Sequence, residues 1–260
     1  MDPSEVAFDN PPVRRVELSV YFKQIQGFQV SHLSRLREQW RGDYPNSAEL
    51  PPVRPVNRSG EETQLLPIGS AWPLPYIVWS TEDEERAVGI QNDRFVISWR
   101  FSEQSEKYPG FAILSAELEQ RLSELKSVVR NETGVELEIL GSECGYLNEL
   151  PETPANKLLV GVATKWTVDG ADGPDIPATY SGIRMHLCND PALRECVLDL
   201  ALDLDDDGPF LSITSAFDLP DEPQGETLGL GGLRHAHDRL IETFLDFTSA
   251  EMHEEWGRRT

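Results

Sequence analysis

The segment from Cys196 to Asp205 alternates strictly between leucine and smaller or acidic residues, a pattern that belongs to an extended chain. Side chains of a strand point to opposite faces in turn, so the leucines are predicted to meet a core. The other face, which is predicted to meet water, carries Asp199, Asp203 and Asp205. The turn residues Asp206–Pro209 then lead into a second apolar run, FLSITSAF, and the two runs predict an antiparallel hairpin.

Several other segments show strand-like alternation or short apolar runs between turns. They are VRRVELSVYF (13–22), three runs between Tyr76 and Arg100, VELEIL (135–140), KLLVGVATKWTV (157–168) and TYSGIRMHL (179–187). Short polar breaks between the runs are typical of antiparallel meanders. The proline-crowded stretch from Tyr44 to Pro75 is predicted to be a loop, because proline lacks the backbone donor that a regular element needs. The sequence therefore predicts a mostly antiparallel sheet.

Two long segments carry apolar residues at helical spacing. In Phe111–Arg130 leucines recur every three or four residues, and Gly134 follows as a helix stop. The second segment has its apolar stripe within Leu233–Leu245. Shorter helices are predicted after Ser31 and at Thr248–Glu251, which has the form of a capping box.

The order of these elements is strands, a helix, strands and a closing helix. This order predicts an α+β fold, in which helices pack on one face of a mostly antiparallel sheet. A chain of 260 residues can bury a single core, so we predict one domain over residues 1–260. Residues 10–130 and 135–258 repeat the order as two similar halves, although no aligned sequence repeat accompanies it.

Acidic residues outnumber basic ones, and the imbalance is uneven along the chain. The formal net charge is −22, and residues 1–130 carry 15 basic and 19 acidic residues, so −18 of the total lies after Arg130. An acidic surface repels phosphate backbones, which argues against sequence-specific binding of nucleic acid. The charge suits a basic protein partner or mimicry of nucleic acid, whereas the simpler interpretation is that it maintains solubility.

The sequence contains no recognisable signal for export or membrane insertion. Residues 1–12 lack the basic and apolar regions of a signal peptide, and no run approaches the ~20 apolar residues that cross a bilayer. The cysteines Cys144, Cys188 and Cys196 lie apart and form no CxxC pair, so they are interpreted as core or near-surface thiols. We therefore expect a cytoplasmic protein without a membrane segment, a metal or another cofactor.

Seven short segments follow one another in a characteristic order. They are Asn10-Pro11-Pro12-Val13, Trp40 to Pro45, Asp93-Arg94-Phe95 running to Trp99-Arg100, Tyr108-Pro109, Tyr146-Leu147-Asn148, Ala236-His237 and Trp256-Gly257-Arg258. Through them nearly the whole chain resembles a family of uncharacterised prokaryotic proteins of similar length that is sporadically distributed among bacteria. The resemblance implies a single domain and carries over no activity. A patchy distribution is also what mobile or defence-associated gene cassettes show, which implies an accessory role.

His237 is the candidate for chemistry in the closing helix. It lies on the apolar stripe, where it is interpreted either as a hydrogen-bonded structural histidine or as a general base beside a carboxylate. His235 faces elsewhere, so the pair lacks the i,i+4 spacing of a helical metal site. The glycine-rich stretch Leu228–Gly232 is interpreted as a flexible entry to the helix, with anion binding by its backbone as the alternative.

Two further groups of charged residues are candidate ligand contacts. Arg94 and Arg100 are predicted on one face of the strand DRFVISWR, where they would clamp a carboxylate or phosphate or, more simply, pair with acids of the chain. Asp203–Gly208 matches the first half of a calcium-loop pattern. Thr214 stands where that loop needs a bidentate glutamate, so an acidic hairpin turn without a metal is predicted.

Two functions are consistent with these observations. The first is a non-enzymatic intracellular binding protein that presents the aspartates of Cys196–Asp205 to a basic protein partner, as an accessory component of a mobile or defence-type gene cassette. The alternative is a small-molecule-binding or hydrolytic enzyme with a pocket between the sheet and the C-terminal helix, to which His237, Arg94 and Arg100 contribute polar groups. The sequence shows no complete pair of nucleophile and base, which favours the first function.

Overall fold

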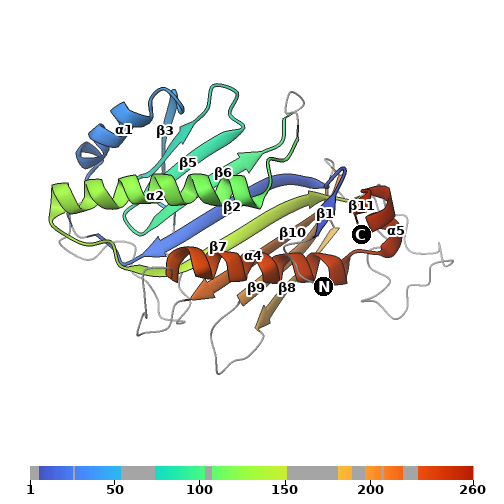
Figure 1. Cartoon of the computed structure of the whole chain (residues 1–260). Helices are drawn as coiled ribbons and strands as arrows, with labels where there is room; N and C mark the ends of the chain where they lie inside the picture. Colours follow the sequence, from blue (N-terminus) through green and yellow to red (C-terminus); the bar gives the residue numbers. More distant parts are fainter. Residues whose placement is uncertain are drawn as a thin grey trace.

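One continuous antiparallel sheet organises the protein (Figure 1). The computed structural model describes residues 6–25, 27–53, 74–102, 107–150, 181–188, 197–205, 208–218 and 228–259. In the order in which they lie side by side, the nine strands are β3 (Asn46–Leu50), β4 (Tyr76–Ser80), β5 (Arg86–Gln91), β6 (Arg94–Arg100), β2 (Val13–Phe22), β7 (Ile139–Glu149), β10 (Gly208–Asp218), β9 (Val197–Asp205) and β8 (Ser181–Cys188). The predicted antiparallel sheet is thereby confirmed.

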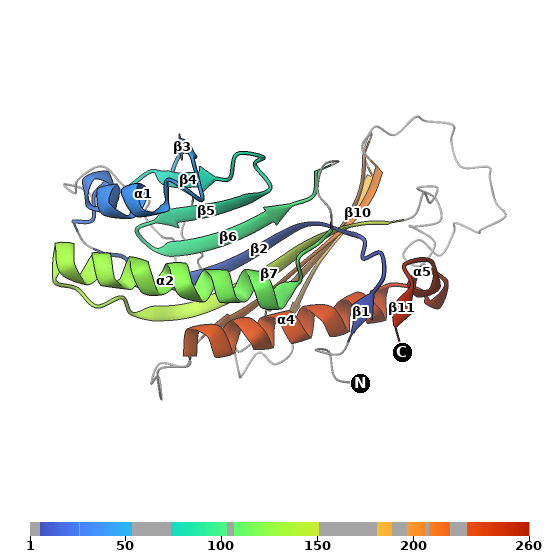
Figure 2. The ribbon, with the colours of Figure 1, turned by 45° about the horizontal axis from the view of Figure 1, so that its top comes forward.

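The helices lie on one face of this sheet. Figure 2 shows α2 (Phe111–Thr133) and α4 (Leu228–Phe247) in one layer against the same side of the strands. The short helix α1 (Ser34–Trp40) follows a 3-10 turn and packs against α2. Helix α5 (Ala250–Glu255) follows α4, and the two-residue strands β1 (Ala7–Phe8) and β11 (Arg258–Arg259) pair beside it. These positions confirm the predicted α+β class with helices on one face.

The two halves of the chain share one topology. In the first half, β2 is followed by the meander β4, β5 and β6 and then by α2. In the second half, β7 is followed by β8, β9 and β10 and then by α4. The last strand of each meander returns to pair with the first strand of its half, and β2 pairs with β7 at the centre. The halves are therefore related by an approximate twofold axis between β2 and β7.

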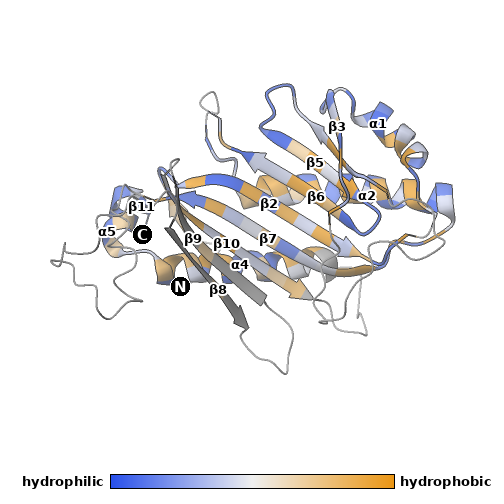
Figure 3. Ribbon diagram, turned by 180° about the vertical axis from the view of Figure 1, so that it is seen from behind, coloured by the Kyte–Doolittle hydropathy of each residue, from blue (hydrophilic) through white to orange (hydrophobic). Residues whose placement is uncertain are grey.

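The core lies between the sheet and the helix layer. Val16, Leu18 and Val20 of β2 are fully buried there, as the alternation predicts. The leucines of α2 at the predicted helical spacing, Leu114, Leu118, Leu122 and Leu125, are buried against them. Figure 3 views the sheet from the other side, where hydrophilic and hydrophobic residues alternate along β2 and β7. The two faces of the sheet thus have different environments.

Two local predictions about chain reversals are confirmed. Gly134 ends α2 in the left-handed conformation, with a φ of 71°, and its N–H donates to the carbonyl of Arg130 at 3.0 Å. In the hairpin of β9 and β10, Asp205 pairs with Gly208, so two residues connect the strands. The meander between Tyr76 and Arg100 also forms as predicted, with β4, β5 and β6 in consecutive antiparallel pairs.

The segment Trp40–Pro45 braces α1 against α2. The Trp40 indole donates to the Glu124 carboxylate, and the Tyr44 hydroxyl donates to Glu117. Arg121 pairs with Asp43, and its guanidinium lies over the Trp40 ring, 5.4 Å from the ring centroid. Because these contacts are mutually satisfied and Trp40 is fully buried, the segment has a structural role.

Three predictions about element boundaries are wrong. The strand expected over residues 135–140 begins only at Ile139, because its partner β2 ends at Phe22, which pairs with Ile139. It then continues to Glu149, a length that local alternation did not indicate. The loop expected over Tyr44–Pro75 contains the edge strand β3, which pairs with β4. The capping residue of α5 is Ser249, because the Thr248 hydroxyl instead donates to the carbonyl of Phe244.

The glycine-rich stretch before the closing helix also differs from its prediction. Leu228–Gly232 forms the first turns of α4 instead of a flexible entry. Gly232 is buried against the sheet, and a Cβ atom there would lie 2.9 Å from both Phe217 Cδ1 and Ser142 Oγ. Glycine is therefore needed for the close approach of α4 to β10 and β7. The predicted strand at 157–168 lies outside the described residues.

Candidate binding site

A cavity of about 990 Å³ lies between α2 and α4, above the centre of the sheet. Helix α2 lines it with one stripe of residues from its first three turns, Phe111, Ala112, Ser115, Ala116 and Glu119. Alanine and serine side chains are short, so this stripe leaves space between the two helices. Helix α4 lines the other side with Leu230, Arg234, His237, Asp238, Ile241 and Phe244. The cavity is therefore built from equivalent helices of the two halves.

A pair of tyrosines forms the floor of the cavity. Tyr146 points from β7 into the helix layer, and its hydroxyl lies 2.6 Å from the hydroxyl of Tyr108. Burial raises the pKa of both phenols, so both stay neutral at physiological pH. Asn148, two residues further along β7, is buried and donates to the carbonyl of Leu211 at 3.2 Å. The floor thus combines aromatic surface with neutral hydrogen-bonding groups.

His237 connects α4 to α2 across the cavity. Its ring stacks on Phe111, with the ring centroids 3.8 Å apart and the planes at 16°. The centroid of the Tyr146 ring lies 5.9 Å away, and His237 Nδ1 is 3.4 Å from Asp238 Oδ1. Burial lowers the pKa of His237, although Asp238 opposes this shift by stabilising the charged form. His237 is therefore a neutral, aromatic wall of the cavity near neutral pH.

The chain ends close one side of the cavity. Residues 7–9 and 11–13 line it, together with Arg259 of β11. The Asp9 N–H donates to the carbonyl of Gly257 and the Asn10 N–H to that of Trp256, each at 3.0 Å. These bonds hold the N-terminal segment to the segment after α5. We call this arrangement of β1, Asp9–Asn10 and β11 the clasp.

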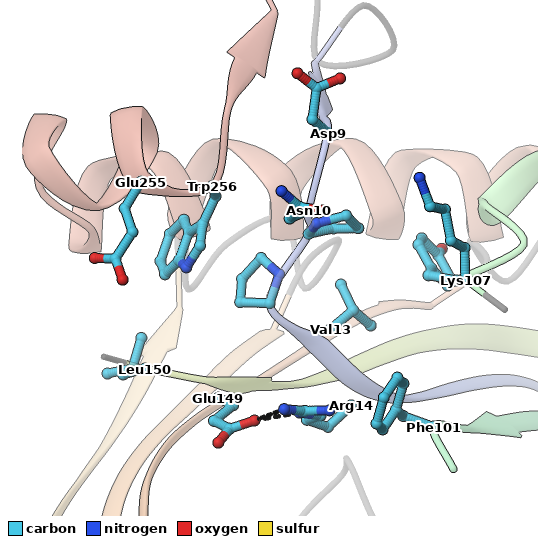
Figure 4. Close-up of a pocket in the computed structure, with 13 residues that line it drawn as sticks. Asp9, Asn10, Val13, Arg14, Phe101, Lys107, Glu149, Leu150, Glu255 and Trp256 are labelled. Carbon is cyan, nitrogen blue, oxygen red and sulfur yellow. Dashed lines mark hydrogen bonds and ion pairs between the residues drawn. The ribbon is translucent and has the colours of Figure 1, made fainter. Parts of the chain in front are cut away.

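A smaller hollow of about 490 Å³ adjoins the clasp (Figure 4). Pro11 and Pro12 border both hollows, and Trp256 stands on the wall of the smaller one. At its base Arg14 forms an ion pair with Glu149, and the Arg14 guanidinium lies over the Phe101 ring, 4.2 Å from its centroid. This hollow is about half the size of the larger cavity, so we regard the larger cavity as the candidate site.

Charged groups stand around the larger cavity. Lys107 and Arg234 form no ion pair with another residue of the described part of the chain. Arg259 is paired with Asp9, with 2.6 Å between Nη2 and Oδ1. The remaining acids of the lining are Glu119 and Asp238, of which Asp238 faces His237. Two cationic groups are thus available to a ligand.

Among the candidate residues predicted from the sequence, Arg94 and Arg100 lie on a different face of the sheet from His237. Arg94 and Arg100 lie on the helix-free face of the sheet, on the side of Tyr21, whereas His237 lies in the helix layer. Arg94 makes a bidentate contact with Asp93, with both N–O distances at 3.1 Å. Arg100 is exposed and lies 3.4 Å from Glu84. A pocket shared by His237, Arg94 and Arg100 is therefore absent from the described residues, and the cavity contains only His237.

The predicted acidic face falls on β9. Asp199 pairs with Thr214, Asp203 with Phe210 and Asp205 with Gly208 in the register of β9 and β10. Their side chains, and the turn residues 206–207, lie outside the part of the chain that the structure describes. Asp203 and Asp205 belong to a strand ladder, which differs from the coil of a calcium loop. The described residues contain no cluster of three or more groups suited to a metal ion.

The cavity lining lacks a nucleophile paired with a base, within the described residues. Ser115 provides its one aliphatic hydroxyl, which donates to the carbonyl of Ala112 in the same helix at 3.2 Å. Cys144 is fully buried, and burial raises the pKa of its thiol well above the ordinary value. A buried, protonated thiol is a poor nucleophile.

Sequence reasoning identified His237 but missed the residues around it. Phe111 was interpreted only as the start of a helix, and Tyr146 lies in the part of β7 that was not predicted. A usable signal was present in the short side chains of Ala112, Ser115 and Ala116, which interrupt the leucine pattern on one side of α2. Five of the segments that carry the family resemblance, those at residues 10–13, 108–109, 146–148, 236–237 and 256–258, contribute residues to the two hollows.

The helices of the described part of the chain are each too short or too polar to span a bilayer. Comparisons of this chain with protein-family models and with curated proteins give no match.

Proposed function

We propose that this protein is a non-enzymatic binding protein whose ligand occupies the cavity between α2 and α4. The ligand class is an elongated small molecule with an aromatic or aliphatic body and an anionic end. The observation that carries the proposal is the size and composition of the cavity. Its volume of about 990 Å³ lies at the upper end of the range, roughly 300–1,000 Å³, of small-molecule pockets.

An apolar body is supported by the surfaces that face the cavity. Phe111, Ile241 and Phe244 line its walls, and the Tyr146 ring forms part of its floor. Stacked and edge-on aromatic contacts favour a flat or chain-like apolar group. His237, neutral near pH 7 because burial lowers its pKa, adds a further aromatic ring to this part of the cavity.

An anionic end is supported by Lys107 and Arg234. In a chain with a net charge of −22, nearby arginines such as Arg14 and Arg259 are paired with carboxylates. Lys107 and Arg234 have no such partner among the described residues, so a carboxylate, sulfonate or phosphate would pair with either of them without breaking an existing ion pair.

Fluorescent probes test this proposal directly. The sulfonate 8-anilinonaphthalene-1-sulfonate combines an aromatic body with an anion, and N-phenyl-1-naphthylamine is its uncharged analogue. We expect saturable binding of the sulfonate and weaker binding of the neutral probe. Ala116→Trp, which adds a bulky side chain to the lining of the cavity, should weaken binding of both probes. Ser123→Trp adds the same side chain at an exposed position of α2 outside the lining and should leave binding unchanged.

Each result has a distinct meaning. Equal effects of Ala116→Trp and Ser123→Trp would show that the probes bind elsewhere, and the proposal would fail. Equal affinity for both probes would remove the anionic end from the proposal and leave the cavity as the site. A cooperative urea-unfolding transition, retained in all variants, excludes binding to a molten state.

A second candidate function is binding of a basic protein partner by the helix-free face. Glu17, Glu143 and Glu149 of β2 and β7 lie on this face in the register of the sheet. Each has a partner within the chain, Arg15, Tyr21 and Arg14 respectively, which weakens the case for them as docking groups. The aspartates of β9 would add to this face. A cytoplasmic setting agrees with the buried, unpaired thiol of Cys144.

A further inference from the structure

His253 of α5 is engaged through both ring nitrogens. Its Nδ1 lies 3.1 Å from Arg258 Nη1, and its Nε2 lies 2.7 Å from Thr248 Oγ1. The Thr248 hydroxyl also contacts the carbonyl of Phe244 in the last turn of α4. His253 thus connects three elements that are adjacent in sequence but different in structure: α4, α5 and β11.

The chemistry of these partners determines the protonation state of the ring. A guanidinium has only donors, so Nδ1 must accept from Arg258 and cannot carry a proton. Nε2 then carries the proton and donates to Thr248 Oγ1. The carbonyl of Phe244 can only accept, so the Thr248 hydroxyl gives it its own proton. Every bond in the chain Arg258–His253–Thr248–Phe244 is satisfied only while His253 is neutral.

The surroundings of His253 disfavour its charged form. Its side chain is buried among Phe8, Phe244 and Trp256, whose ring centroids lie 6.0–6.4 Å from its own. Arg258 of β11 is the cation beside it, and the ion pair of Arg259 with Asp9 crosses the clasp nearby. Glu254 and Glu255 follow it in α5, are exposed, and form no ion pair with it. Burial and the Arg258 charge both lower the pKa of His253.

The hydrogen-bonded chain ends at the clasp. Arg258 pairs with Phe8 across β11 and β1, and Phe8 packs against Phe244 and Trp256, with centroids 6.0 Å from each. Ala7, Phe8 and Asp9 line the large cavity. Loss of the bond between Arg258 and His253 would therefore loosen the wall that closes one side of the cavity.

We infer that His253 is an acid-sensitive latch that holds the clasp closed and opens that side of the cavity when its ring is protonated. Protonation places a second N–H against the guanidinium of Arg258, which removes the acceptor and adds a like charge. Release of the ligand at mildly acidic pH then follows, and this last consequence rests on the proposed function.

The direction of the pH dependence follows from the lowered pKa. His253 binds its proton more readily with the clasp open, where its pKa approaches the ordinary value of 6.5. The neutral ring therefore stabilises the closed clasp above about pH 6.5, and this stabilisation is lost as the pH falls below that value. With one proton linked to opening, a fall to about pH 5.5 raises the opening constant by up to about tenfold.

Hydrogen exchange of the clasp amides tests the latch in the whole 260-residue chain. The N–H groups of Asp9 and Asn10 are protected by their bonds to residues 257 and 256. After correction for intrinsic exchange, we expect protection to fall by up to about tenfold between about pH 7.5 and about pH 5.5. His253→Gln retains an acceptor and a donor but does not titrate, so its protection should change little. His32→Gln, in the 3-10 turn before α1 and outside both hollows, should behave like the unmodified protein, because His32 has no part in the hydrogen bonds that link Arg258, His253, Thr248 and Phe244.

A second measurement needs no variant. Nitrogen NMR of the His253 ring should show the tautomer protonated at Nε2, with a pKa below the ordinary value. A proton on Nδ1, or a pKa above the ordinary value, overturns the inference. The inference also fails if the exchange protection of the Asp9 and Asn10 amides depends equally on pH in the unmodified protein and in His253→Gln.

The latch and the proposed ligand can fail separately. If the sulfonate probe binds but its affinity has the same pH dependence in His253→Gln, the latch is refuted and the binding site stands. If clasp protection depends on His253 and the probe does not bind, the latch stands and the proposed function is refuted.

Discussion

Replacing Gly232 by alanine tests how closely α4 is seated on the sheet. The added Cβ would lie 2.9 Å from both Phe217 Cδ1 and Ser142 Oγ, and neither neighbour is the far end of a long flexible chain. Helix α4 must therefore move outward or the phenyl ring must rotate. Overpacking by one methyl group in such a site costs about 1–3 kcal/mol of unfolding free energy.

The same substitution also has a favourable effect, which a control separates. Alanine is a better helix former than glycine by up to about 1 kcal/mol. Gly231 precedes Gly232 in α4 and is exposed, and a Cβ atom added there would have no other atom within 4 Å. Gly231→Ala should therefore stabilise the protein by about 0.5–1 kcal/mol, whereas Gly232→Ala should be neutral or destabilise it by up to about 2 kcal/mol.

Urea unfolding followed by far-ultraviolet circular dichroism measures both variants. The difference between them, about 1–3 kcal/mol, is the packing cost alone, and it corresponds to roughly 2–4 °C in Tm for each kcal/mol in a domain of this size. Equal stabilisation by both substitutions would refute the close approach of α4 to β7 and β10. An outward shift of α4 should also weaken binding of the sulfonate probe, because α4 forms one wall of the cavity.

Two further predictions concern the floor of the cavity and the acidic strand. Tyr108→Phe removes the hydroxyl that is hydrogen-bonded to Tyr146. Because the buried Tyr146 hydroxyl then loses its partner, urea unfolding should show a loss of about 1 kcal/mol in the free energy of unfolding. An unchanged unfolding midpoint would show that water or another group replaces the lost hydroxyl. Asp199→Asn, Asp203→Asn and Asp205→Asn, combined in one variant, should weaken capture of a polylysine peptide at low salt. The free energy of unfolding should stay within about 0.5 kcal/mol, since charges on a face that the alternation predicts to meet water contribute little to stability. Unchanged capture would assign the acidity of β9 to solubility.

The position of the candidate site follows from the approximate twofold arrangement. Each half ends in a helix that crosses the sheet, and the two helices meet above the central pair β2 and β7. Short side chains on α2 face longer ones on α4, so the groove between them is not filled by the protein itself. The N-terminal segment and the residues after α5 then close one side through the clasp.

Local periodicity was sufficient for most of the secondary structure. The alternation in Val13–Phe22 and Val197–Asp205, the leucine spacing in α2 and the two-residue turn before Gly208 each depend on residues close in sequence, so their predictions are confirmed. The approximate extent of the helices could be predicted for the same reason. The start of β7 could not, because it is determined by where β2 ends, more than 100 residues earlier.

The candidate site depends on contacts between distant segments. Tyr108, Tyr146 and His237 come together only because β7 pairs with β2 and α4 packs across it. The guanidinium groups of Arg94 and Arg100 are suited to binding an anion. Side chains alternate between the two faces along β6, however, and this alternation places both arginines on the opposite face of the sheet from His237. The glycines of α4 were interpreted as a flexible segment, because local sequence contains no information on how near another element lies. Composition and spacing determined which elements this chain forms, and only tertiary packing decided which side chains face one another, because that depends on pairing across the sheet.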